Sequence, residues 1–289
     1  MKQYYLYVFI FLLVIFMEKI NSVTYLFSHG FADTGRQANT YMREYRTRRD
    51  KPKINKFYII DGPVKTFNYP DVVCKPFPNI FQTSFGQENE LSVLQNAYNE
   101  IKKEETDIVL VGVSRGASAA SVFMGSYDCK RVKAVILISP FAHVYDVFKT
   151  NFFYRLFIKI SKYEHKGKHP IDWLPKMNKN IPVLFVCSKT DKTVPCFSTI
   201  RLYKKLISCG HKHAYLLCLD IGKHAKFLKA PEAEKFQNVT HAFYKQYGLP
   251  YNENFAIAGQ QELQDCKLSS KSLDFEFGDL DSDFWDNFG

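Results

Sequence analysis

The sequence predicts an α/β fold, with a mostly parallel sheet that carries helices on both faces. Two observations lead to this prediction. Short apolar, β-branched runs alternate along the chain with amphipathic helical segments, which is typical of strands buried on both faces. One run, residues 108–113, also leads directly into a helical segment through Gly112-Val113-Ser114-Arg115-Gly116. The 289 residues, 46% of them hydrophobic, are enough for one domain with a sizeable core.

The first 22 residues have the pattern of a leader. Lys2 precedes an uncharged apolar run, residues 4–17, which is short for a membrane span but suits the hydrophobic region of a signal peptide. Cleavage after Ser22 would give a secreted or periplasmic protein. The alternative is an uncleaved N-terminal membrane anchor.

The charge is unevenly distributed. The formal net charge is +10, yet residues 252–289 contain nine acidic residues and only two lysines. We therefore expect residues 23–250 to form the domain and residues 251–289 to form an acidic, disordered tail. No zinc-finger, RNA-recognition or basic-zipper pattern occurs, so a nucleic-acid partner is not expected. The N-terminal segment or a basic face could associate with a membrane surface.

The other elements follow in chain order. Residues 23–28 predict the first strand, and the later strands are expected at residues 57–60, 132–140, 182–187 and 214–219. Helices are expected at residues 37–49, 90–103, 201–207 and 227–247. Residues 141–180 break the alternation with a broad aromatic helical face. This stretch is either a short cap inserted over the sheet or a face that covers the core.

The turn at Ser114 has a specific structural requirement. A strand, one residue and a helix leave no room for a loop, so Ser114 is expected on a sharp, strained turn. Gly112 and Gly116 lack a Cβ, which lets the strand and the helix approach closely. The serine hydroxyl would then stand at the end of the sheet, near the positive end of the helix. The alternative is a serine that only caps the helix.

This stretch resembles the nucleophile elbow of the α/β-hydrolase superfamily. His29-Gly30-Phe31 resembles the oxyanion loop of that family, and Asp191-Lys192-Thr193-Val194-Pro195 resembles its acid loop. His224 follows the last expected strand, where the family places its histidine. The order Ser…Asp…His is that of the family.

The resemblance implies a catalytic triad of Ser114, Asp191 and His224, with the backbone N–H groups of Phe31 and Arg115 as the oxyanion hole. It implies a serine hydrolase that cleaves a carboxylic ester or thioester of a small-molecule or lipid-like acyl substrate, without metal or cofactor. A peptidase or amidase, and a binding protein without turnover, are the alternatives. Asp220, four residues before His224, is an alternative orienting acid.

Several residues depart from the family pattern or leave choices open. The oxyanion loop is not the HGGG sequence of many lipases, and Arg115 could lie near the pocket mouth or pack outside it.

Cys187 and Cys218 lie in apolar runs and are expected in the core. The seven cysteines allow one or two disulfides of unknown connectivity, and none shows zinc-ligand spacing. His143 is expected in the core or on the surface, with a place in the pocket lining as the alternative. His211 and His213 are expected on the surface.

Overall fold

The computed structural model describes residues 23–31, 33–42, 44–45, 53–54, 57–70, 88–104, 106–149 and 167–267. The expected leader, much of the expected cap (residues 150–166) and residues 268–289 lie outside the described residues. Within the described part of the chain, no helix is both long and apolar enough to cross a membrane.

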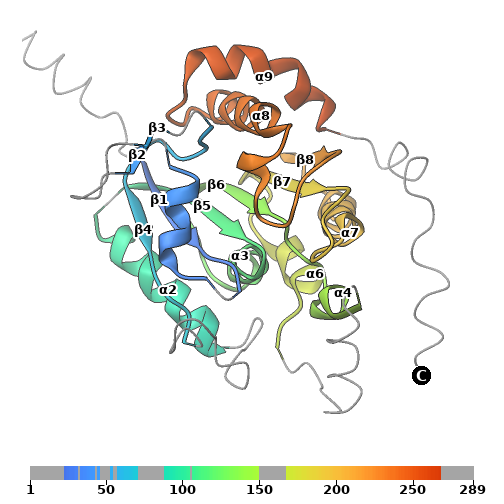
Figure 1. Ribbon diagram of the computed structural model, residues 1–289. Helices are drawn as coiled ribbons and strands as arrows, with labels where there is room; N and C mark the ends of the chain where they lie inside the picture. The colour runs from blue at the N-terminus through green and yellow to red at the C-terminus, as the bar shows by residue number, and fades with distance from the viewer. Residues whose placement is uncertain are drawn as a thin grey trace, which may run out of the picture.

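A six-stranded parallel sheet forms the centre of the molecule (Figure 1). Its strand order is β4-β1-β5-β6-β7-β8, and every neighbouring pair is parallel. The strands are β1 (Val23–Ser28), β4 (Val64–Thr66), β5 (Asp107–Val113), β6 (Val132–Ile138), β7 (Val183–Ser188) and β8 (Ala214–Leu219). A small antiparallel pair, β2 (Glu44–Tyr45) and β3 (Lys53–Ile54), lies apart from this sheet. The predicted α/β class is confirmed.

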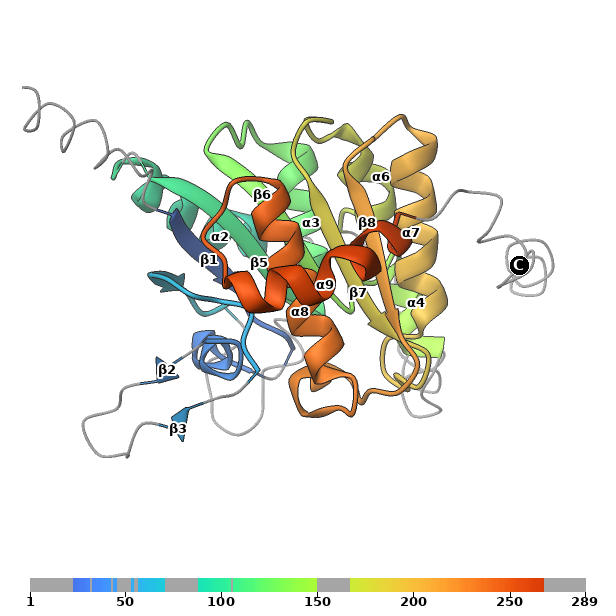
Figure 2. The ribbon, with the colours of Figure 1, turned by 90° about the horizontal axis from the view of Figure 1, so that it is seen from above.

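Alternate residues of β1 and of β5 to β8 face two separate apolar cores, as the period of two in a strand requires. In β5, Ile108 and Leu110 belong to one core, and Val109 and Val111 belong to the other. The first core is covered by α2 (Glu88–Lys102), α3 (Arg115–Ser126) and α7 (Cys196–Ser208). The second core is covered by α8 (Ala233–Gln246), with α9 (Glu253–Asp265) outside it (Figures 1 and 2).

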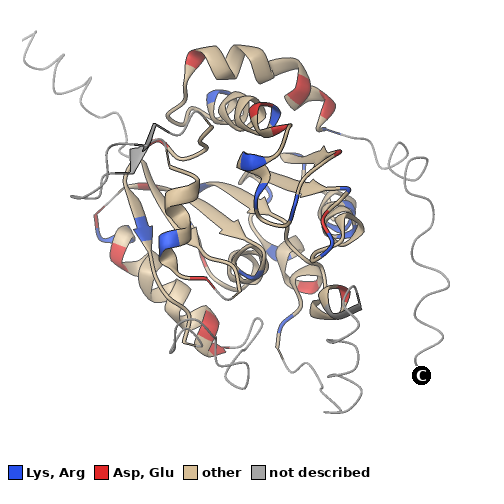
Figure 3. Cartoon of the chain, in the orientation of Figure 1, with Lys and Arg blue, Asp and Glu red and all other residues tan. Residues whose placement is uncertain are grey.

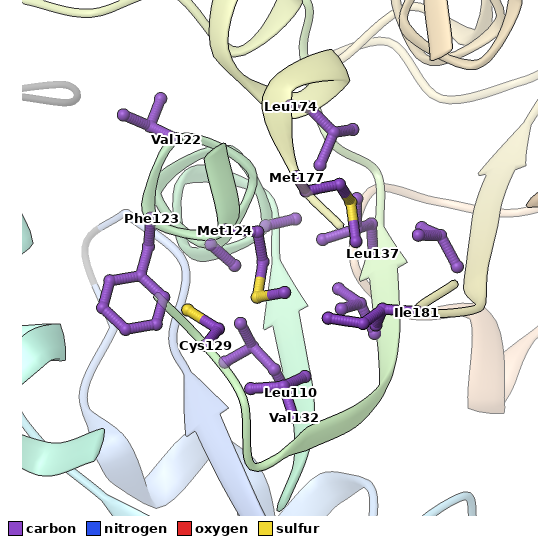
Figure 4. Close-up of a cluster of buried hydrophobic side chains, with 14 of the residues drawn as sticks. Leu110, Val122, Phe123, Met124, Cys129, Val132, Leu137, Leu174, Met177 and Ile181 are labelled. Atoms are coloured by element: carbon purple, nitrogen blue, oxygen red, sulfur yellow. The ribbon is translucent and has the colours of Figure 1, made fainter. Parts of the chain in front are cut away.

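The described part of the expected cap contributes to the first core. It contains α4 (Val144–Lys149), α6 (Pro170–Trp173) and a 3₁₀ turn, η2 (Leu174–Lys176). Leu174 is fully buried, and Met177 packs beside Met124 of α3 over the sheet residue Leu137 (Figure 4). Residues 174–177 therefore cover core.

The segment between β1 and α2 differs from the prediction. Among the described residues of the helix expected at 37–49, residues 37–40 belong to a 3₁₀ turn, η1 (Gly35–Thr40), and residues 44 and 45 form β2. The expected strand at residues 57–60 does not join the central sheet, because the N–H groups of Ile59 and Ile60 both donate to the carbonyl of Tyr41. The edge position beside β1 is taken by β4 instead.

The C-terminal part of the domain also differs. The helix expected at residues 227–247 is divided into a 3₁₀ turn, η3 (Phe227–Lys229), and α8. Pro231 lies between them, and a proline inside a helix removes a hydrogen bond and clashes with the preceding turn.

The expectation that a disordered tail begins at residue 251 is wrong for residues 253–265, which form α9. The side chain of Asn252 caps this helix by accepting hydrogen bonds from the N–H groups of Asn254 and Phe255. A Cβ on the buried Gly259 would collide with the carbonyl of Asn238, so α8 and α9 pack backbone to backbone. The acidic residues of α9 lie at its two ends (Figure 3), which leaves an apolar middle that composition alone obscures.

Candidate active site

Ser114 lies on a strained turn between β5 and α3. Its φ and ψ are 54° and −120°, a combination that a residue with a Cβ rarely adopts. A Cβ on Gly112 would lie 2.5 Å from the Cα of Ala117, and a Cβ on Gly116 would collide with the carbonyl of Ser28. Both glycines are therefore needed for the strand–turn–helix geometry that the sequence predicts. The Ser114 side chain makes no capping hydrogen bond to α3, so the alternative that Ser114 only caps the helix is wrong.

The structure brings Ser114, His224 and Asp191 into one hydrogen-bonded chain. The Nε2 atom of His224 lies 2.9 Å from the Ser114 hydroxyl, and its Nδ1 atom lies 2.8 Å from Oδ2 of Asp191. Because a carboxylate only accepts, Nδ1 carries the proton and Nε2 is left to accept from the hydroxyl. Ser114 and Asp191 are buried, with 8% and 6% exposure.

Parallel strands explain why these three side chains meet. Ser114 directly follows β5, Asp191 follows β7 and His224 follows β8. The carboxyl ends of parallel strands share one edge of the sheet, where α/β proteins bind ligands. Ser114 and His224 are therefore within hydrogen-bond distance although they are 110 residues apart in the sequence.

Asp191 is held from two sides. Its Oδ1 accepts from the N–H groups of Thr193 and Val194 at 2.9 and 3.0 Å. Its Oδ2 faces the His224 ring and also accepts from the hydroxyl of Ser139 at 3.1 Å. The tight turn of the acid loop therefore fixes the carboxylate with Oδ2 toward the histidine.

The alternative acid, Asp220, is placed differently. Its carboxylate lies 2.7 Å from the Nζ of Lys189, and its side chain is 69% exposed. The hydrogen bond and charge of Lys189 lower the pKa of Asp220. The partner of His224 in the structure is Asp191.

The expected oxyanion loop lies beside the serine. A Cβ on Gly30 would lie 3.6 Å from the Cβ of Ser114, and the N–H of Gly30 donates to Oε1 of Gln37 at 2.8 Å. Phe31 comes next in this loop. Arg115 is the first residue of α3, where N–H groups have no acceptor within the helix. Both expected donors therefore belong to segments next to Ser114.

His29 has a structural role in this loop. Its Nε2 accepts from the N–H of Tyr69 at 3.2 Å, so Nδ1 carries the proton that is donated to the carbonyl of Gly30 at 2.8 Å. The Tyr69 hydroxyl in turn lies 2.6 Å from the Ser28 hydroxyl, which donates to the carbonyl of Gly116. These bonds connect the oxyanion loop to the start of α3.

The Arg115 side chain does not lie at a pocket mouth or outside the domain. It is 1% exposed, and its guanidinium stacks over Tyr69, 4.3 Å from the ring centre, with the Phe31 ring at 5.7 Å. Its Nε lies 3.6 Å from Oε1 of Glu90, which is also buried. A buried charge needs a partner. Glu90 and Tyr69 were not predicted to lie at the site, although a long cation in a motif of small residues indicates that an acid lies nearby.

The other histidines lie outside the hydrogen-bonded chain. The His143 ring packs on His169, 4.2 Å between ring centres, at the start of the expected cap. Burial and the neighbouring His169 lower the pKa of His143 to about 4. His211 is buried at 4% exposure, so the expectation that it lies on the surface is wrong.

Among the described residues, one group has the spacing of metal ligands. The sulfur atoms of Cys187, Cys196 and Cys218 lie within 4.8 Å of one another. The cluster adjoins the acid loop and does not contact the Ser114 hydroxyl. In the sequence, Cys196 is 9 residues from Cys187 and 22 residues from Cys218, so the three cysteines do not form a recognisable sequence motif.

Comparison with known proteins supports the fold. No family model matches the chain, and no curated protein matches it. Among solved structures, an esterase from Pyrococcus furiosus has a TM-score of 0.55 at 15% identity, covering 79% of this chain and 83% of that one. An acylaminoacyl peptidase from Pyrococcus horikoshii has a TM-score of 0.53 at 18% identity, covering 83% and 40%. A puromycin-hydrolyzing peptidase from Mycobacterium tuberculosis has a TM-score of 0.54 at 13% identity, covering 80% and 35%.

This chain spans less than half the length of the two peptidases, and all three identities are low. The likeness therefore concerns the arrangement of the backbone. The parallel sheet order, the strained turn at Ser114 and these similarities together show that the chain has the α/β-hydrolase fold.

Proposed function

We propose that the protein is a serine hydrolase that cleaves a carboxylic ester or thioester through an acyl-enzyme. The observation that carries the proposal is the hydrogen-bonded chain from the Ser114 hydroxyl through His224 to Asp191. A serine hydroxyl is a weak nucleophile at neutral pH and needs an oriented base within hydrogen-bond reach. The strained backbone at Ser114 is typical of a nucleophile that is held away from the sheet.

In the proposed first step, the Ser114 oxygen attacks the carbonyl carbon while His224 Nε2 takes the hydroxyl proton. Asp191 stabilises the imidazolium and keeps Nε2 toward the serine. The imidazolium then gives its proton to the leaving alcohol or thiol, and the acyl group remains on Ser114. In the second step, His224 removes a proton from water, and the resulting attack releases the carboxylic acid and restores Ser114.

The N–H groups of Phe31 and Arg115 are the proposed donors to the oxyanion. A donor of this kind, fixed before the reaction begins, typically contributes about 3 kcal/mol to transition-state stabilisation. The packing of Arg115 against Tyr69 and Glu90 supports this role, because it fixes the first turn of α3. The same machinery can cleave amides, so a peptidase or amidase is the second candidate.

The test uses a fluorescent fluorophosphonate probe on the full chain, with Ser114→Ala and Ser121→Ala as paired variants. Ser121 is a buried serine of the same helix whose hydroxyl bonds to the carbonyl of Ala117. We expect labelling of the wild type and of Ser121→Ala, and none of Ser114→Ala. A folded wild type that is not labelled would instead favour a binding protein without turnover.

Substrate class is tested on labelled protein with matched 4-nitrophenyl esters and 4-nitroanilides that carry the same acyl group. The proposal predicts a much higher kcat/KM for the ester after correction for the intrinsic reactivity of each bond. Comparable corrected values, or a preference for the anilide, would favour the amidase.

A further inference from the structure

Three thiols from three different elements meet beside the acid loop. Cys187 lies in β7, Cys218 is its register partner in the neighbouring strand β8, and Cys196 is the first residue of α7. The Sγ atom of Cys196 lies 2.7 Å from that of Cys187 and 3.2 Å from that of Cys218. Cys196 is therefore the central thiol, with a neighbour on each side.

These separations suit a sulfur–sulfur bond better than a shared metal ion. Thiolates bound to one zinc ion at about 2.3 Å lie about 3.8 Å from one another in tetrahedral geometry. Both distances from Cys196 are shorter than that. A disulfide needs only a small further approach, to about 2.05 Å.

We propose that these thiols form a disulfide-exchange site, in which Cys196 is bonded to Cys187 and Cys218 is the thiol that can take over the bond. The oxidant is a small disulfide of the glutathione class. The Cys196 thiolate attacks it, forms a mixed disulfide and releases one small thiol. The Cys187 thiolate then attacks the Cys196 sulfur and releases the second small thiol. The two cysteines lose two electrons and two protons in total, and the small disulfide gains them.

The exchange step needs no oxidant. The Cys218 thiolate attacks the Cys196 sulfur, the bond to Cys187 breaks, and Cys187 leaves as a thiolate that is then protonated. The Sγ atom of Cys196 lies closer to that of Cys187 than to that of Cys218, at 2.7 Å against 3.2 Å. The shorter separation assigns the resting bond to Cys187 and Cys196, with Cys218 as the free thiol.

The position of the Cys187–Cys196 bond predicts an effect on thermal stability. Cys187 and Cys196 are nine residues apart, and the loop between them carries Asp191. A bond across the base of this loop restricts it in the unfolded chain. We expect the oxidised protein to melt several degrees above the reduced protein.

The experiment maps the thiols of the full chain after equilibration with oxidised glutathione. Free thiols are alkylated, the protein is digested with trypsin without reduction, and linked peptides are identified by mass spectrometry. Trypsin separates the three cysteines into peptides 180–189, 193–201 and 213–223. The expected product is 180–189 linked to 193–201, with Cys218 alkylated.

The variants separate the central thiol from its partners. In Cys187→Ser, we expect 193–201 to be linked to 213–223 instead. In Cys196→Ser, both of these links should be lost. Cys209→Ser, at the far end of α7, is the matched control and should leave the wild-type map unchanged. Circular dichroism of each variant checks that it is folded.

Two results would overturn the proposal. One is a wild-type protein in which all three thiols are alkylated after equilibration with oxidised glutathione. The other is a protein that binds one equivalent of zinc, which protects the three thiols until a chelator removes it. Neither result depends on turnover, so the proposed hydrolase activity and this site can fail independently.

Discussion

The hydroxyl of Ser139 lies 3.1 Å from Oδ2 of Asp191, the same oxygen that faces Nδ1 of His224 at 2.8 Å. Ser139 directly follows β6 and has a φ of 49°, so it has a positive φ like Ser114. Strain of this kind persists where the surroundings fix it. The relationship makes Ser139 a positioning residue for the acid.

Removal of this hydroxyl is expected to impair the proposed reaction without abolishing it. A hydrogen bond to a charged group contributes about 1.5 kcal/mol, and 1.36 kcal/mol corresponds to a tenfold change in rate. We therefore expect Ser139→Ala to lower kcat for ester hydrolysis about tenfold with little change in KM. Ser121→Ala removes a buried hydroxyl that bonds within α3 and serves as the control. An equal loss in both variants would show that the effect is one of general packing.

The choice between the two acids gives a second prediction. Asp191→Asn keeps the size of the side chain but removes the charge that holds His224 in the correct tautomer, so kcat should fall by about 10⁴. Asp220→Asn alters an exposed residue whose partner is Lys189, and its kcat should stay near that of the wild type. The measurement is steady-state ester hydrolysis by both variants at one pH. A large loss for Asp220→Asn alone would contradict the assignment.

The strands and the candidate site could be predicted largely because they depend on local sequence. The runs in β5, β6, β7 and β8 are largely apolar on both faces, and each candidate triad residue lies in the segment that follows the carboxyl end of a strand. The environment of those residues could not be predicted. Ser139, Glu90 and the three clustered cysteines are recognised only by what lies next to them in the folded chain. The acidic composition after residue 252 also concealed the small, apolar face by which α9 packs on α8.

The buried pair of Arg115 and Glu90 gives a third prediction. Both side chains are almost fully buried, so removing one of them takes an opposite charge away from the other inside the core. Arg115→Met and Glu90→Leu should each lower the free energy of unfolding by about 3 kcal/mol. The double variant should be more stable than either single variant, because neither charge then remains in the core. The measurement is urea unfolding of the four proteins.

An exposed pair provides the comparison. Lys65 and Glu100 form a salt bridge in which both side chains are about half exposed. Lys65→Met should change the unfolding midpoint little, because water screens such a pair.

One outcome would contradict the interpretation of the buried pair. If the double variant of Arg115 and Glu90 loses as much free energy of unfolding as the two single variants together, the two side chains act independently.

Acid sensitivity gives a fourth prediction, centred on His211. Burial, followed by the charge of His213, lowers the pKa of His211 from 6.5 to about 4. Between these values the unfolded chain binds a proton that the folded chain does not, so a falling pH favours unfolding. This contribution to stability is complete above pH 6.5 and is lost as the pH falls toward 4. At 1.36 kcal/mol per pKa unit, the loss is at most about 3 kcal/mol.

A variant that cannot titrate tests this contribution. His211→Gln keeps a polar side chain but takes up no proton, so its free energy of unfolding should fall less between pH 7 and pH 4.5 than that of the wild type. Lys212→Gln, which removes an exposed charge next to His211 in the sequence, should keep the wild-type slope. The slope is the quantity to compare, because either substitution can change stability equally at all pH values. Parallel curves for His211→Gln and the wild type would mean that His211 takes up its proton equally in both states, and the acid sensitivity would then have to arise from other groups such as His143.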